Sequence, residues 1–159
     1  TGALGHGLPV GVGMCLGSKS LKIKNKVYVV LGDGELHEGS NWEALMFAGH
    51  HQLENLVIFV DNNGQSQIGE TDKAVSLRNL KAKIKAFDFS VKEANGHNLI
   101  QLKKILNKNK KSKKPLAIIC DTTKGKGVSF MENNNLWHYK APRGDDYKNS
   151  INELTKRSR

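Results

Sequence analysis

The stretch 27-VYVVLGDG-34 joins a short apolar run to an aspartate that lies between two glycines. An uninterrupted apolar run of this length, ended by glycine, is typical of a β-strand that is buried on both faces. A second run, 56-LVIFVD-61, has the same character and leads into the turn sequence 62-NNG-64. The run 116-LAIICD-121 predicts a third strand, and residues 87–94 form a weaker candidate.

Segments with helical spacing of apolar residues alternate with these strands. They cover residues 5–17, 39–51, 73–86 and 99–108. Alternating strands and helices predict an α/β fold, with a mostly parallel sheet and helices on both faces. We predict a single domain over residues 1–159, in which residues 124–159 form an irregular C-terminal segment rich in Gly, Asn and Lys.

The length of 159 residues is enough for one domain with a hydrophobic core. Because Thr1 already lies in what reads as a structured segment, we expect a chain that lacks its N-terminal part. No apolar run approaches the roughly 18 residues of a membrane-spanning helix, so we predict no membrane contact. Cys15 and Cys120 lie far apart in apolar segments, which indicates two buried free thiols of a cytoplasmic protein.

The net charge of +10 raises the possibility of nucleic-acid binding. The lysines cluster at residues 19–26, 81–85 and 103–114, without the interleaved aromatic residues of a base-stacking surface. A solvated basic face explains such charge runs, so we predict no nucleic-acid partner.

Polar residues follow each strong strand, at the sheet edge where ligands bind in parallel α/β folds. Asp33 lies between glycines that let the backbone approach a ligand, and Asn63 offers an amide oxygen beside the turn at Gly64. A carboxylate, an amide oxygen and a main-chain carbonyl suit Mg²⁺, which takes further ligands from water and phosphates. A helix that begins near Glu38 or Gly39 adds N–H donors toward a phosphate. The sequence therefore predicts a Mg²⁺-bound diphosphate.

The pattern resembles the signature of thiamine diphosphate enzymes, in which Gly-Asp-Gly precedes Asn-Asn with 27 residues (35–61) between them. The segment 32-GDGELHEGSNWEALMFAGHHQLENLVIFVDNN-63 is similar to the cofactor domain of transketolases. So are 1-TGALGHGLPVGVGM-14, 95-NGHN-98 and 122-TTKGKGVSFMENNNLWHYKAP-142. The resemblance covers nearly the whole chain, and is greatest to the N-terminal subunits of transketolases that are split into two polypeptides. It implies the thiamine diphosphate-binding fold.

The resemblance implies a set of metal ligands. Asp33 and Asn63 bind Mg²⁺ through their side chains, and Gln65 binds it through its main-chain carbonyl. Glu38 lies at a dimer interface, where the family links two active sites. The partners implied are a C-terminal transketolase subunit or domain and sugar phosphate substrates, in a homodimer or heterotetramer.

The resemblance also implies the residues that bind the cofactor. Gly34 contacts the diphosphate through its N–H, and His138 and Lys124 reach the same group. Gly2 and Leu4 lie against the aminopyrimidine ring. The glutamate that protonates this ring lies in the family's second domain, so we expect no catalytic residue in this chain.

The function implied is transfer of a two-carbon ketol unit from a ketose phosphate to an aldose phosphate, a cytoplasmic reaction of the pentose phosphate type. The alternatives are a 1-deoxyxylulose-5-phosphate synthase-like or other thiamine-dependent transferase, a non-catalytic scaffold protein, and a basic nucleic-acid-binding domain. The presence of Asp33, Asn63 and His138 argues against a decayed scaffold.

Overall fold

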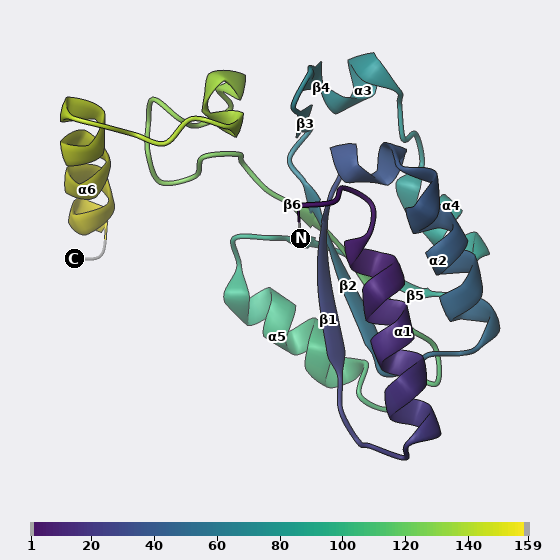
Figure 1. The fold of residues 1–159 in the computed structure, drawn as a ribbon. Helices are drawn as coiled ribbons and strands as arrows, with labels where there is room; N and C mark the ends of the chain where they lie inside the picture. Colours follow the sequence, from purple (N-terminus) through teal and green to yellow (C-terminus); the bar gives the residue numbers. More distant parts are fainter. Residues whose placement is uncertain (1, 158–159) are drawn as a thin grey trace.

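The computed structural model describes residues 2–157 (Figure 1). At its centre lies a parallel four-stranded sheet in the order β1–β2–β6–β5. The strands are β1 (Val27–Gly32), β2 (Leu56–Asn62), β5 (Ser90–Asn95) and β6 (Leu116–Asp121). All the strands that the apolar runs predict are present, including the weaker one.

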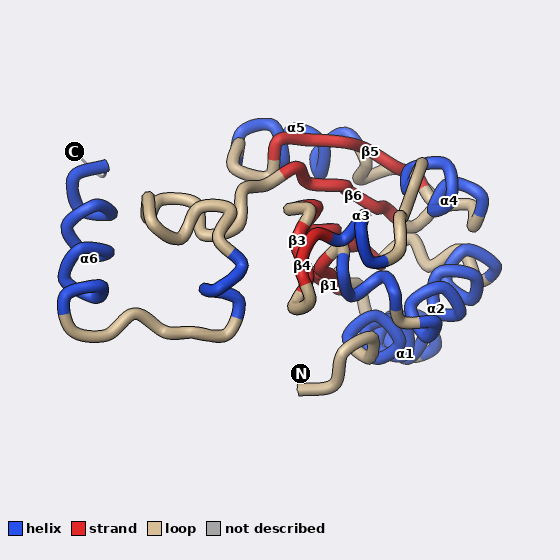
Figure 2. The backbone as a smooth tube through the Cα atoms, turned by 90° about the horizontal axis from the view of Figure 1, so that it is seen from above, coloured by secondary structure: helices blue, strands red, loops and turns tan. Residues whose placement is uncertain are grey.

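Helices cover both faces of the sheet, as predicted (Figures 1 and 2). On one side lie α1 (Gly7–Ser20), α2 (Gly39–His50) and α4 (Leu80–Ala86). On the other side lies α5 (Leu99–Lys108), which packs on β5 and β6. The prediction of an α/β fold with a parallel sheet is therefore confirmed.

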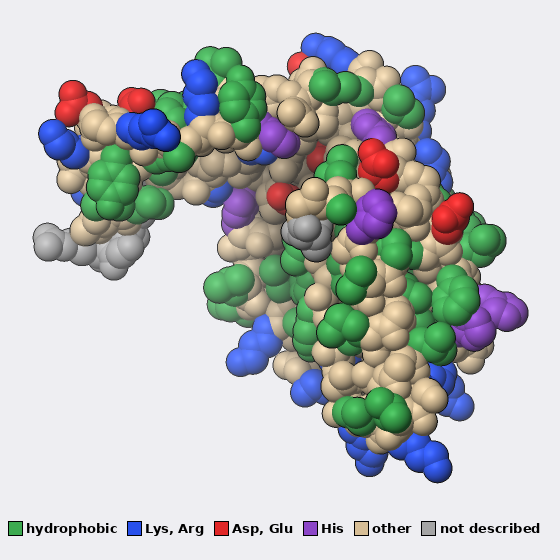
Figure 3. Space-filling model, viewed as in Figure 1, with side chains coloured by type: hydrophobic (Ala, Val, Ile, Leu, Met, Phe, Trp, Pro, Cys, Tyr) green, Lys and Arg blue, Asp and Glu red, His purple; other side chains and the backbone are tan. Residues whose placement is uncertain are grey.

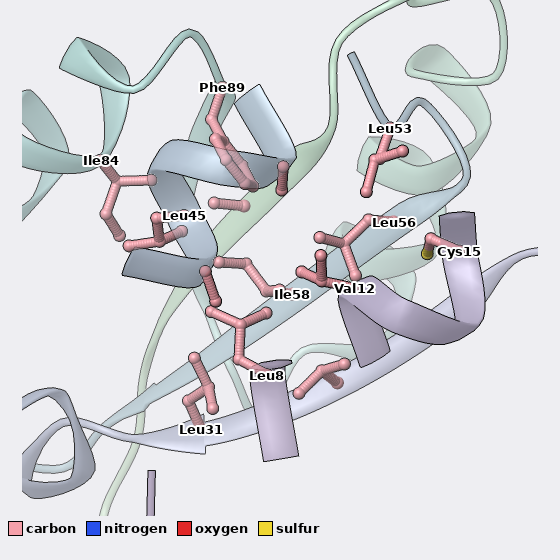
Figure 4. Close-up of a cluster of buried hydrophobic side chains, with 14 of the residues drawn as sticks. Leu8, Val12, Cys15, Leu31, Leu45, Leu53, Leu56, Ile58, Ile84 and Phe89 are labelled. Carbon is pink, nitrogen blue, oxygen red and sulfur yellow. The ribbon is translucent and has the colours of Figure 1, made fainter. Parts of the chain in front are cut away.

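The sheet separates two hydrophobic cores. Figure 4 shows the larger core, in which side chains from α1, α2 and α4 meet those of β1 and β2. Its fully buried members include Leu8, Leu31, Leu45, Ile58 and Ile84. The smaller core lies beneath α5. β2 and β6 are covered on both sides, and their sequences are continuously apolar rather than alternating. The prediction that β1 is buried on both faces is wrong for one face, on which Tyr28 and Val30 are exposed.

The prediction of a continuous helix over residues 73–86 is wrong for the middle of that segment. The structure divides it into α3 (Thr71–Ala74) and α4, with an extended connection between them. Asn79 ends this connection with a φ of +53°, and its side chain accepts a hydrogen bond from the N–H of Ala82 at 3.3 Å. This is an N-cap, and an Asn directly before an apolar helix is a signal for one.

The prediction that residues 124–159 are irregular is wrong for their last part, where α6 (Asp145–Arg157) is a regular helix. Acidic residues in its first turn, Asp145 and Asp146, favour a helix start through the helix dipole. Figures 1 and 2 show α6 standing apart from the sheet. It is held to the preceding loop by Glu153, which accepts hydrogen bonds from the N–H and Oγ of Ser129 at 2.6 and 2.7 Å.

Both cysteines are buried free thiols, as predicted. Burial raises the pKa of Cys15 and of Cys120 to about 11, so both thiols stay protonated at neutral pH. Within residues 2–157, no helix combines the length and the apolar character that crossing a bilayer requires.

The close approach of α2 to the loop before β5 provides a test of the packing. A Cβ on Gly49 would lie 1.8 Å from the carbonyl oxygen of Phe87, a contact that only a backbone shift relieves. We expect Gly49→Ala to lower the free energy of unfolding by about 2 kcal/mol or more in urea titrations followed by circular dichroism. As the matched control, Gly13→Ala adds a methyl where no atom lies within 4 Å and should not destabilise the protein. Equal stability of both variants would contradict this packing.

Candidate functional site

The ends of three strands meet at one edge of the sheet. The register pairs Gly32 with Asp61 and Asp61 with Cys120, so β1, β2 and β6 end side by side. Asp33 follows directly on β1, and its N–H donates to the carbonyl oxygen of Asp61 at 3.1 Å. Asn62 at the end of β2 donates through Nδ2 to Asp121 Oδ1 at 2.9 Å. The predicted convergence of these strand ends is confirmed.

Asp33 is a buried carboxylate with only 2% of its surface exposed. Its Oδ1 accepts from the N–H of Gly34 at 2.9 Å, and its Oδ2 accepts from the N–H of Gly64 at 2.8 Å. Within the described residues, no Lys, Arg or His nitrogen lies within 4.0 Å of its oxygens. Each oxygen keeps a free lone pair, so the side chain can still bind a cation.

Asn63 is oriented by its neighbour on β2. Its Nδ2 donates to Asp61 Oδ2 at 3.1 Å, and the other oxygen of Asp61 accepts from the hydroxyl of Thr122. The carboxylate therefore fixes which end of the amide is nitrogen, because only the NH₂ group can face it. Asn63 Oδ1 is left as the acceptor and takes the N–H of Gln65 at 2.9 Å.

A cavity of about 470 Å³ lies over this edge. Its wall includes the 3₁₀ turn η1 (Gly34–His37) and the short strand β3 (Gln65–Ser66), which pairs with β4 (Gly69–Glu70). The residues predicted for metal and cofactor that line it are Leu4, Asp33, Gly34, Asn63, Gln65, Lys124 and His138. Gly2 is the only predicted site residue that does not line the cavity.

His138 brings the C-terminal loop to the cavity, at the end of the 3₁₀ turn η2 (Asn135–His138). Slight burial, together with the positive charge of Lys124, lowers the pKa of His138 below its usual value. The neutral imidazole therefore predominates at pH 7 and offers one N–H donor and one acceptor.

Known proteins that resemble this chain point to one family. The model of the transketolase thiamine diphosphate binding domain matches residues 1–156. This chain belongs to that family.

Two kinds of relative accompany the family match. The chain is 42% identical over 154 residues to an apulose-4-phosphate transketolase subunit from Actinobacillus succinogenes, with 97% of this chain and 56% of the relative covered. It is 36% identical to a 6-deoxy-6-sulfo-D-fructose transketolase subunit from a Clostridium species, with 98% of this chain and 57% of that subunit covered. The chain thus spans little more than half of the length of these subunits.

A solved structure shows the same fold. The crystal structure of transketolase from Campylobacter jejuni superimposes with a TM-score of 0.88 at 33% identity, and the match covers 98% of this chain and 25% of the other. This transketolase domain therefore has the fold of about a quarter of that larger chain.

The side chains of this transketolase domain fit a hard cation better than a soft one. Within residues 2–157, no group of three His, Cys, Asp or Glu side chains gathers to hold a metal. The carboxylates that line the cavity are Asp33, Glu35, Glu38 and Asp61, of which Asp33 is the buried one, and Asn63 adds an amide oxygen. Buried Gln65 Oε1 has no hydrogen-bond partner, although its Nε2 donates to the carbonyl of Asn133 at 2.9 Å. Oxygen donors of this kind suit Mg²⁺ bound together with a phosphate.

Two residues of the transketolase domain have contacts that local sequence patterns do not reveal. Glu35 Oε1 accepts the N–H of Gly5 at 2.9 Å, across 30 positions. His97, in the segment 95-NGHN-98, accepts the N–H of Thr123 on Nε2 at 2.9 Å. The only sequence signal for Glu35 is its place directly after Gly-Asp-Gly.

The hydrogen bonds of Asp61 generate a prediction for this edge. We expect Asp61→Asn to weaken binding of Mn²⁺, as a probe for Mg²⁺, by about tenfold, because Asn63 loses its carboxylate partner and the cavity loses a negative charge. Titration followed by the electron paramagnetic resonance signal of free Mn²⁺ measures the change. Asp72→Asn, at an exposed carboxylate on α3, should leave the affinity unchanged. Unaltered Mn²⁺ affinity in Asp61→Asn would show that Asp61 does not orient the site.

Proposed function

We propose that this chain binds thiamine diphosphate and Mg²⁺ for the transfer of a two-carbon ketol unit from a ketose phosphate to an aldose phosphate. The observation that carries the proposal is the buried Asp33 carboxylate, which faces a cavity and has no cation partner within the described residues. A buried charge is costly unless it is compensated. A bound cation supplies that compensation.

The proposed ligands follow from the chemistry of the cavity wall. Asp33, Asn63 and the main-chain carbonyl of Gln65 hold Mg²⁺. The N–H of Gly34 and the side chains of Lys124 and His138 bind the diphosphate. When bound, thiamine diphosphate supplies the carbanion chemistry that breaks and forms the carbon–carbon bond. The residues of this chain bind and orient the cofactor.

Gly2 and Leu4 are proposed to contact the organic part of the cofactor. Leu4 lines the cavity with an apolar side chain, which suits a ring rather than a charged group. Gly2 adopts a φ of +74°, which favours glycine, and this turns the chain into the segment that carries Leu4.

The substrates are proposed to be sugar phosphates or similar acidic sugars, in reactions of the pentose phosphate type. The relatives are named for apulose-4-phosphate and for 6-deoxy-6-sulfo-D-fructose, two sugars that carry an anionic group. A cytoplasmic location agrees with two buried, unpaired thiols.

A partner that covers α1 is a further part of the proposal. The apolar residues of α1 are distributed around the whole helix rather than along one face, and a helix of this kind is normally buried on all sides. Val10 and Met14 on its outer side are exposed, as are Leu21 directly after the helix and Met46 of the neighbouring α2. Figure 3 shows hydrophobic side chains over this part of the surface. We propose that the C-terminal transketolase subunit, or a second copy of the complex, packs here, with the exposed Glu38 at its margin.

The cofactor proposal predicts Mg²⁺-dependent binding of thiamine diphosphate to the chain together with its partner subunit. Asp33→Ala should abolish this binding in calorimetric titrations, because it removes the only buried carboxylate in the described part of the cavity. Asp72→Ala, at an exposed acid, should bind as the wild type does. A folded, associated wild-type complex that binds no thiamine diphosphate would favour the scaffold alternative.

The partner proposal predicts a loss of association in a charged variant of α1. Met14→Glu should weaken binding of the C-terminal subunit by about tenfold or more, since it buries an unpaired charge in an apolar interface. Leu99→Glu places the same charge on an exposed residue of α5, across the sheet, and should leave the affinity unchanged. Sedimentation velocity of each mixture measures the association. An unaffected Met14→Glu complex would exclude α1 as the surface that binds the C-terminal subunit.

A further inference from the structure

Gly5 is held through both of its main-chain polar groups by side chains of the 34–40 region. Its N–H donates to Glu35 Oε1 at 2.9 Å, and its carbonyl oxygen accepts from Ser40 Oγ at 2.7 Å. The second oxygen of Glu35 accepts the N–H of Gly32 at the end of β1, at 3.3 Å. Glu35 thus ties the segment before α1 to the strand end that carries Asp33.

The fit around Gly5 is close. Gly5 is buried with a φ of +77°, and a Cβ there would lie 2.6 Å from Glu38 Cβ and 2.8 Å from Ser40 Oγ. The backbone of Gly5 therefore packs directly against the side chains of Glu38 and Ser40 at the start of α2. Leu4, the preceding residue, lines the cavity although 60% of its surface is exposed. A residue so exposed has little packing of its own to fix its position.

We infer that Glu35 and Ser40 are positioning residues, which hold Leu4 against the ring portion of the bound cofactor by fixing Gly5. This inference rests on the proposed binding of thiamine diphosphate. The cofactor has a diphosphate end and an organic end. Asp33, Asn63, Lys124 and His138 belong to the polar and charged part of the wall, which suits a diphosphate that is bound together with Mg²⁺. Leu4 has no polar side-chain atom to offer a diphosphate, so its contribution belongs to the organic end.

The inference separates two ligands that share the diphosphate. Loss of the Gly5 contacts should weaken the binding of thiamine diphosphate but leave the binding of inorganic diphosphate unaffected. Glu35→Gln keeps the shape of the side chain, but its amide has only one oxygen for two N–H donors. Ser40→Ala removes the second contact without a change of charge. Loss of the Glu35 charge acts on both ligands alike, because both carry the diphosphate and bind together with Mg²⁺. A loss of affinity that is confined to thiamine diphosphate therefore cannot arise from charge.

The experiment is calorimetric titration of the complex between this chain and its partner subunit, in the presence of Mg²⁺. One series adds thiamine diphosphate and the other adds inorganic diphosphate. We expect Glu35→Gln to raise the dissociation constant of thiamine diphosphate roughly tenfold, and Ser40→Ala to raise it less, with diphosphate unchanged within about twofold. Glu43→Gln makes the same charge change at an exposed position of α2 and should bind both ligands as the wild type does.

Hydrogen exchange provides a second readout. In Glu35→Gln, peptides that cover residues 2–7 should exchange faster than in the wild type, while peptides of β2 and β6 should not. Unchanged thiamine diphosphate affinity in both variants, or an equal loss for both ligands, would overturn the inference. A wild-type complex that binds neither ligand would instead refute the proposed function, so the two failures are distinguishable.

Discussion

The parallel register of β1, β2 and β6 determines where the functional groups of this chain lie. Gly32, Asp61 and Cys120 occupy the same level of the sheet, so the residues that follow each strand enter one small volume. Hydrogen bonds across the strand ends then fix the individual side chains, as between Asp61 and Asn63. The site is therefore a product of strand alignment first and of local turns second.

Electrostatics separates this edge from the rest of the surface. The ion pairs between described residues join lysines to acids elsewhere, such as Lys19 with Glu54 and Lys81 with Glu93. Asp33, Glu35 and Asp61 accept hydrogen bonds only from neutral donors. A chain with a net charge of +10 thus keeps its acids unpaired at one edge of the sheet, where they can act on a cation. This arrangement of acids agrees with the proposed cation site at that edge.

The sequence predicted the features that depend on local pattern. Continuous apolar runs mark β1, β2 and β6, although β1 leaves Tyr28 and Val30 exposed on one face. The apolar spacing in residues 99–108 matches the bounds of α5. Turn residues after the strands located the edge of the site. The break at Asn79 was missed because the apolar spacing continues across it. Helix α6 was missed because few apolar residues mark it in a segment rich in Gly, Asn and Lys.

Contacts between distant segments could not be predicted in the same way. Glu35 reaches Gly5 across 30 positions, and His97 reaches Thr123 across 26. Neither pair has a spacing rule, because each contact depends on how helices and strands pack. The roles of the metal and cofactor residues remain proposals, although the structure brings all of them except Gly2 to one cavity.

The lysine-rich loop between α5 and β6 lies at the edge of the sheet opposite to the cavity, because it enters β6 at the amino end of that strand. The loop between α1 and β1 lies at the same edge, and Figure 3 shows lysines gathered there. Insertions, deletions and changes of charge in these loops leave the ends of β1, β2 and β6 undisturbed. The sheet thus separates the site from these surface loops, and loops are the segments that vary most in sequence among related proteins. Changes of charge in these two loops should therefore leave the arrangement of Asp33 and Asn63 unaltered.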